Sequence, residues 1–177
     1  MNETFIIENG NLKKCTDTDS AVIRLPDEVT VVESGAFRSL TQTEEIIFGP
    51  CLHKIESKAF EGCEKLKTVR FHSADVWLGE GVFCSAVSPL TVYYPGTQAD
   101  WSRITAPRIE DRNRFYDGGW GGGAPGFYWD EYKVFPLYHR DEKAFICRVL
   151  CLADGKELIC RGEPKSVLVA RHSPYFD

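Results

Sequence analysis

The chain lacks the features that mark a membrane protein or a nucleic-acid-binding protein. Its 177 residues contain no apolar run near the roughly 18 that a membrane helix needs, and even the stretch 144–153 holds Arg148. Its net charge of −5 at pH 7 gives no general reason to expect nucleic acid. Hydrophobic content of 43% is ordinary for a folded domain. We therefore expect a globular protein with neither a membrane nor a nucleic-acid partner.

The seven cysteines lack the spacing of a metal knuckle or a redox motif, since none is separated from the next by two residues. An odd number is also a poor basis for a disulfide scaffold. The start of the chain, 1–4, is polar and acidic, unlike a secretory signal. We interpret the cysteines as reduced core thiols, with no metal. The expected location is the cytoplasm, or outside the cell if the sequence is a piece of a longer chain.

Catalytic motifs are also missing. The four histidines are scattered, with no His-Glu-x-x-His, and there is no Gly-x-Ser-x-Gly turn. Residues 121–126 formally match the dinucleotide pattern Gly-x-Gly-x-x-Gly, but Asp117-Gly118-Gly119 precedes them in place of a strand and Pro125 interrupts them. We expect no cofactor and no enzyme.

What the chain does have is an internal repeat of 23 residues, seen first in Ala36-Phe37, Ala59-Phe60 and Val82-Phe83. A unit of this length cannot bury its own apolar face, so stacked copies share one core, as in a solenoid. Alternate residues in each short strand point inward, and each buried Phe supplies about 1.5–3 kcal/mol. Further columns keep the same step: Ile23, Ile46, Val69 and Val92; Leu25, Phe48, Phe71 and Tyr94; Val32, Ile55 and Leu78; and Leu40, Cys63 and Ala86.

Three stretches of the repeat, Leu25–Thr30, Gly35–Phe37 and Ala59–Cys63, resemble the BspA-like leucine-rich repeat family. The opening, Phe5–Leu12, is similar to the turn that often caps such repeats, and Thr91–Trp101 is similar to the family's terminal rung.

The resemblance covers residues from about 5 to 105 and implies a mainly β fold, a short right-handed solenoid with strands along one face. We count three rungs and assign residues 1–107 to this unit. Family members are common in gut and oral bacteria and are mostly binding or adhesion modules without catalysis. Many are exported, whereas this chain opens directly on the cap.

The terminal rung predicts a short helix over about 98–104. Thr97 followed by Asp100 resembles a capping box. A helix placed there would turn Trp101 and Ile104 onto the open end of the solenoid, which repeat arrays must cover.

Beyond Pro107 the period stops, and residues 108–177 read as a C-terminal antiparallel β appendage. The stretch 115–132 holds six glycines and seven aromatic residues. Asp154-Gly155 is a strong hairpin signal. The appendage either packs on the solenoid or stands alone. Its strand candidates are Tyr132–Tyr138, Ala144–Ala153, Lys156–Cys160 and Lys165–Arg171.

The residue between two inward positions of a strand must face outward, which places Arg24, Ile47, Arg70 and Tyr93 in one exposed row. Such side chains are enriched at interface hot spots, so we expect this row to bind a protein partner.

Two alternatives stay open. In the first, Trp120 and Trp129 in the segment 115–132 form an aromatic platform for a glycan or small ligand, as in a sensor or an enzyme. In the second, the module associates with itself through open rung edges. The sequence does not decide the oligomeric state.

Overall fold

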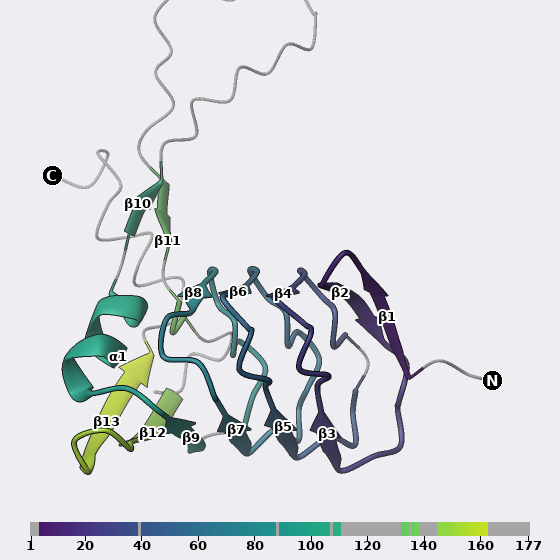
Figure 1. Cartoon of the computed structure of the whole chain (residues 1–177). Coiled ribbons are helices and arrows are strands. Elements are labelled where there is room, and N and C mark those ends of the chain that lie inside the picture. Colours follow the sequence, from purple (N-terminus) through teal and green to yellow (C-terminus); the bar gives the residue numbers. More distant parts are fainter. Residues whose placement is uncertain are drawn as a thin grey trace, which may run out of the picture.

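The repeats form a β-solenoid in which two mostly parallel sheets face each other across one core (Figure 1). Each turn of the chain adds one strand to each sheet, so strands far apart in sequence lie side by side. This arrangement confirms the mainly β solenoid predicted from the 23-residue step. The computed structural model describes residues 4–38, 40–87, 89–106, 108–110, 132–134, 136–138 and 145–162.

The two sheets differ in strand length, and we name them the narrow sheet and the broad sheet. The narrow sheet has the order β1-β2-β4-β6-β8, and the broad sheet has the order β13-β12-β9-β7-β5-β3. The narrow sheet consists of β1 (Phe5–Glu8), β2 (Asn11–Cys15), β4 (Val31–Val32), β6 (Lys54–Ile55) and β8 (Trp77–Leu78). The broad sheet consists of β3 (Val22–Arg24), β5 (Glu45–Ile47), β7 (Thr68–Arg70), β9 (Leu90–Tyr94), β12 (Phe145–Cys151) and β13 (Lys156–Gly162).

The solenoid has about four turns, one more than the three rungs counted from the sequence. The additional turn comes from β2, which pairs parallel to β4 with Leu12 opposite Val32. Later turns keep the 23-residue step, as in Val32 opposite Ile55. Leu12 precedes Val32 by 20 residues rather than 23, so the narrow-sheet strand of the first turn falls outside the repeat step. The sequence also did not resolve the narrow sheet, because most of its strands have only two residues.

The predicted inward columns form the core. Ile46, Val69 and Val92 are fully buried, and the pairings of the broad sheet place them next to one another. The Phe60 ring stacks between Phe37 and Phe83, with ring centroids 4.9 and 5.7 Å apart. The recurring phenylalanines of the repeat therefore form one stack in the core.

An antiparallel hairpin of β1 and β2 closes the N-terminal end of the narrow sheet. Its turn is Asn9-Gly10, and both residues have positive φ, 51° and 79°, as a two-residue hairpin turn requires. A side chain at Gly10 would place its Cβ 2.8 Å from Thr30 Oγ1, so the next turn of the solenoid packs directly on this glycine. The capping turn expected from Phe5–Leu12 is thus present.

The helix α1 (Gln98–Thr105) covers the C-terminal end, as predicted. The amide of Asp100 donates to Thr97 Oγ1 at 3.2 Å, and the amide of Thr97 donates to Asp100 Oδ2 at 3.0 Å. These reciprocal bonds complete the capping box. The Thr97 hydroxyl also donates to Asp100 Oδ2 at 2.7 Å, and this bond, followed by the one from the Thr97 amide, holds the pKa of Asp100 below its usual value. Trp101 and Ile104 are buried, and the Trp101 ring lies edge-on to Tyr94 at 5.2 Å.

Replacing Thr97 with alanine is expected to lower the free energy of unfolding by about 0.5–2 kcal/mol, because the cap satisfies an otherwise unpaired amide at the helix start. Urea titration of the two proteins measures this difference. Thr97→Ser keeps the hydroxyl and should retain most of the stability. Equal midpoints for wild type and Thr97→Ala would show that the capping box does not stabilise the end of the solenoid.

The C-terminal hairpin is built into the solenoid. β12 and β13 pair antiparallel around Asp154-Gly155, as predicted, and β12 pairs parallel to β9, with Val149 opposite Val92. The amide of Gln98 donates to Asp154 Oδ2 at 3.0 Å, which joins the hairpin turn to the start of α1. The hairpin therefore extends the broad sheet by two strands and does not stand alone.

A second antiparallel pair, β10 (Arg108–Glu110) and β11 (Tyr132–Val134), follows α1. The strand expected over Tyr132–Tyr138 ends at Val134, before a turn at Pro136-Leu137. The strand candidate Lys165–Arg171 lies outside the described residues, and so does most of the glycine-rich and aromatic segment 115–132.

Candidate functional site

The outward face of the broad sheet carries the four residues predicted as the binding row. Arg24 is opposite Ile47, Ile47 is opposite Arg70, and Arg70 is opposite Tyr93. The sheet pairings continue the row onto the C-terminal hairpin, which sequence reasoning missed. We call this the first outward row: Arg24, Ile47, Arg70, Tyr93, Leu150 and Glu157.

A second outward row lies beside the first, two residues earlier on each repeat strand. Its ends are apolar and exposed: Val22 on β3 has 51% of its surface accessible and Ile159 on β13 has 58%. The second outward row is Val22, Glu45, Thr68, Thr91, Arg148 and Ile159. Together the two rows make one continuous face over six strands.

Arg70 is held in place from two sides. Its guanidinium forms an ion pair with Glu45 and lies over the Tyr93 ring, 3.9 Å from the ring centroid. The hydrogen bond to Glu45 raises the pKa of Arg70. The row was interpreted from sequence as cationic at two positions, but Glu45 neutralises one of them. The sequence contained a sign of this ion pair, because Glu45 precedes Arg70 by one repeat step plus two residues and so lies on the neighbouring strand.

Arg24 differs from Arg70. It is exposed, and among the described residues it has no ion pair. It lies on β3, the first strand of the broad sheet, so its charge is available to a carboxylate from outside the chain.

The hairpin end of the face holds a second neutralised pair. Arg148 donates from Nε to Glu157 Oε1 at 2.5 Å and from Nη2 to Oε2 at 3.1 Å. This bidentate contact raises the pKa of Arg148 and lowers that of Glu157. The face therefore alternates aliphatic and aromatic groups with ion pairs whose charges are already compensated.

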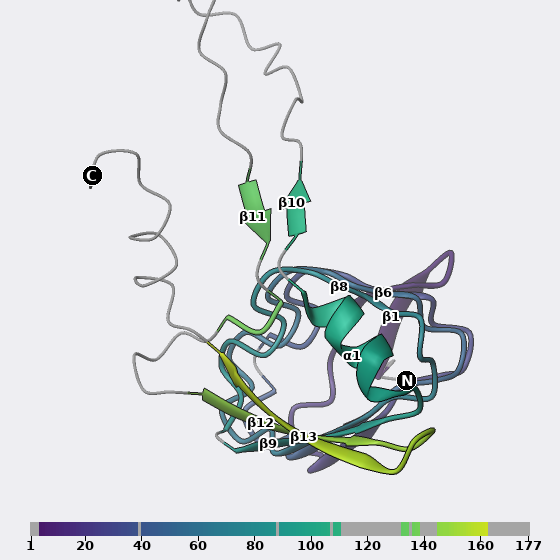
Figure 2. The same cartoon turned by 90° about the vertical axis from the view of Figure 1, so that its left-hand side faces the viewer.

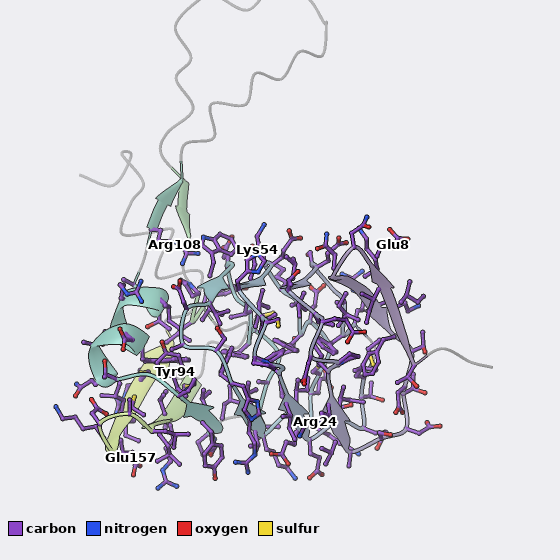
Figure 3. The ribbon with its side chains drawn as sticks, viewed as in Figure 1. Glu8, Arg24, Lys54, Tyr94, Arg108 and Glu157 are labelled. Atoms are coloured by element: carbon purple, nitrogen blue, oxygen red, sulfur yellow. The ribbon has the colours of Figure 1, made fainter. Side chains whose placement is uncertain are left out.

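The narrow sheet presents a different surface, on the opposite side of the molecule (Figure 3). Lys13 pairs with Glu33, and Lys54 pairs with Glu56. Trp77 lies between two cations, with Lys54 Nζ 5.2 Å and Arg108 Cζ 4.5 Å from the ring centroid. These contacts lie within the chain, so we assign them to the stability of the solenoid.

Most cysteines in the described residues are buried and unsuited to act as nucleophiles or metal ligands. Cys15, Cys63, Cys84, Cys147 and Cys151 are buried, which confirms the core-thiol interpretation for them. Burial raises the pKa of Cys63 to about 12 and also raises that of Cys147, so both thiols stay protonated at neutral pH. Cys51 is exposed, and for it the interpretation was wrong.

No group of three or more His, Cys, Asp or Glu residues is arranged to hold a metal within the described ranges. The same part of the chain contains no helix with the length and apolar character needed to span a bilayer. Trp120 and Trp129, the residues of the alternative aromatic site, lie outside the residues that the structure describes.

Comparison with known proteins gives one match. A sequence model described as "BspA type Leucine rich repeat region" matches residues 6–98, in six copies, which is just over half of the chain. No curated protein matches the chain, and neither does any solved structure.

Proposed function

The chain belongs to the BspA-type leucine-rich repeat family, and on that premise we propose that it is a non-enzymatic module that binds a protein partner on the outward face of its broad sheet. Repeat modules of this family commonly mediate protein interactions. The observation that carries the proposal is the register that aligns Arg24, Ile47, Arg70 and Tyr93 as neighbours on one exposed face.

The composition of the face fits a protein interface. Tyrosine, arginine and large apolar groups are the types that supply most binding energy, whereas lysine and aspartate are depleted from interface centres. The two outward rows hold three arginines, one tyrosine and four aliphatic residues, and they contain no lysine and no aspartate.

Preorganisation adds to this fit. Arg70 is already fixed between Glu45 and Tyr93, so a partner that packs on Tyr93 does not have to order a long cationic side chain. Ile47 and Leu150 supply apolar contact on either side of this group. Arg24, whose charge is uncompensated, would receive an acidic side chain of the partner.

The proposal predicts that the double variant Arg24→Glu with Arg70→Glu captures the partner at least about tenfold more weakly than wild type, because both hot-spot cations are reversed. Capture from a lysate of the source cells, quantified by mass spectrometry, measures the difference. A matched control is Lys14→Glu with Arg38→Glu. This control reverses Lys14, which has no ion pair within the described ranges, and Arg38, which is paired with Glu61. Both lie away from the broad sheet.

The control variant should capture as wild type does. Equal capture by the Arg24/Arg70 variant would contradict the proposal. If capture instead falls in Trp120→Ala with Trp129→Ala, the site belongs to the segment 115–132, as in the sensor or glycan-binding alternative.

A further inference from the structure

The outermost strand of the broad sheet, β13, presents its edge at the C-terminal end of the solenoid. Figure 2 looks onto this end, with β13 in front and α1 above it. β13 has seven residues and pairs with β12 on one side only, and no other described strand pairs with it. A free edge of this length offers a row of backbone amides and carbonyls to another strand.

The residues of β13 are self-complementary. If two copies pair antiparallel about Ile159, Glu157 of one chain is directly opposite Arg161 of the other, and the reverse pair forms as well. All three side chains are exposed and lie on the outward face, because they alternate with Leu158 and Cys160. Directly opposite residues of unlike charge stabilise an antiparallel pair.

We propose that two copies of this chain associate through antiparallel pairing of their β13 strands, in the register that places Ile159 on the two-fold axis. The broad sheet then continues from one subunit into the other. Each subunit uses the same strand, so the interface is closed and forms a dimer rather than a fibre.

Neighbouring registers fit less well. A two-fold axis at Leu158 places Glu157 opposite Ile159, and an axis at Cys160 places Ile159 opposite Arg161. Each of these registers leaves one charge opposite the aliphatic Ile159 and shortens the paired segment. The register centred on Ile159 uses the whole strand and buries two Ile159 side chains, each 58% exposed in the single chain, against each other.

Within the described ranges, Arg161 carries an uncompensated charge on β13, whereas Glu157 already takes part in an ion pair within its own subunit. Arg161 is exposed and has no ion pair among the described residues. Glu157 is bound to Arg148 in its own subunit. A carboxylate has about four acceptor positions, so it can also accept from Arg161 of the partner subunit. At the other end of the sheet β3 has only three residues, which makes it a much weaker edge for pairing.

Sedimentation velocity on the full-length chain over a range of concentrations tests the proposal. We expect wild type to approach the mass of two 20.0 kDa chains as concentration rises. Arg161→Glu and Glu157→Arg should each weaken the dimer by roughly tenfold or more, since each places two pairs of like charges opposite one another. Arg24→Glu, on the far edge, should leave the dimer unchanged.

Mixing the two single variants gives the decisive result, because pairing a Glu157→Arg chain with an Arg161→Glu chain restores both opposite-charge pairs. We expect a heterodimer from two proteins that are each monomeric, which a folding defect would not produce. Wild type that stays monomeric, or a mixture that does, would overturn the proposal.

Amide hydrogen exchange distinguishes a second copy from a segment of the same chain, such as residues 163–177, on this edge. Protection of the β13 edge amides should increase with protein concentration. Protection that does not depend on concentration would assign the edge to the chain itself and overturn the proposal.

Discussion

Replacing Phe60 with alanine is expected to lower the free energy of unfolding by about 3–5 kcal/mol, as for other large core residues. Phe60 is fully buried in the middle of the ring stack. Phe37 and Phe83 lie on its two faces, and Phe48 lies at an angle 5.9 Å away. Three successive turns of the solenoid contribute one ring each to this stack, so the cavity left by alanine would interrupt it at its middle ring.

Denaturant titration followed by circular dichroism measures the loss. Phe60→Leu is the matched control, since leucine fills most of the space and should cost clearly less than alanine. The outer rings Phe37 and Phe83 have a stacked neighbour on one side only, so their alanine variants should also cost less. If the free energy of unfolding falls less for the Phe60 variant than for either outer ring, the ring stack is not the main source of stability in the repeats.

Replacing Trp101 with alanine is expected to cost a similar amount, about 3–5 kcal/mol, for a different reason. Trp101 is the largest fully buried side chain in the part of the chain that the structure describes. It closes the end of the core, with Tyr94 at 5.2 Å and Phe71 at 6.4 Å. The helix α1, which carries Trp101, also contacts β13 of the C-terminal hairpin. Truncation of Trp101 therefore exposes the core at the last turn and weakens the packing of β12 and β13 against the end of the solenoid.

Trp77 provides a matched control of the same residue type. It is 36% exposed on the narrow sheet and is held chiefly by Lys54 and Arg108. Exposed cation–π contacts are worth about 0.5–1 kcal/mol each, so Trp77→Ala should cost much less than Trp101→Ala. Equal losses, measured by the same titration, would contradict the role of Trp101 as the cover of the solenoid.

The repeat was predictable from sequence because identical positions in successive turns must meet the same neighbours. Each inward column, such as Ile46 and Val69, needs apolar side chains of similar size, which leaves a regular trace in the sequence. The capping box at Thr97 and Asp100 was predictable for another reason, since it is local and spans only one helical turn. Local and periodic constraints can therefore be read without a structure.

The attachment of β12 to β9 was not predictable. The alternation of Cys147, Val149 and Cys151 shows which face of β12 is buried, but it fits any neighbouring strand. The chain between β9 and β12 has no repeat that would carry a register forward. This is why the outward row was predicted to end at Tyr93, when the sheet pairings extend it to Leu150 and Glu157.

The charge of the candidate face was also overestimated from sequence. Arg24 and Arg70 occupy equivalent positions of the repeat, so the sequence predicts the same charge for both. The structure shows that Glu45, from a neighbouring position of the repeat, compensates Arg70. A diagonal contact between adjacent turns depends on side-chain direction, which a list of columns does not contain. The face is consequently more apolar in character than predicted, with Arg24 as its available cation.

Binding of a protein partner to the outward face of the broad sheet can be observed residue by residue. Hydroxyl-radical footprinting of the chain, free and in complex with the captured partner, tests it most directly. We expect oxidation of Tyr93 and Leu150 to fall in the complex, while oxidation of Trp120, Trp129 and Trp77 stays as in the free chain. Unchanged oxidation of Tyr93 and Leu150, with protection at Trp120 and Trp129, would contradict the account and move the binding site to the segment 115–132.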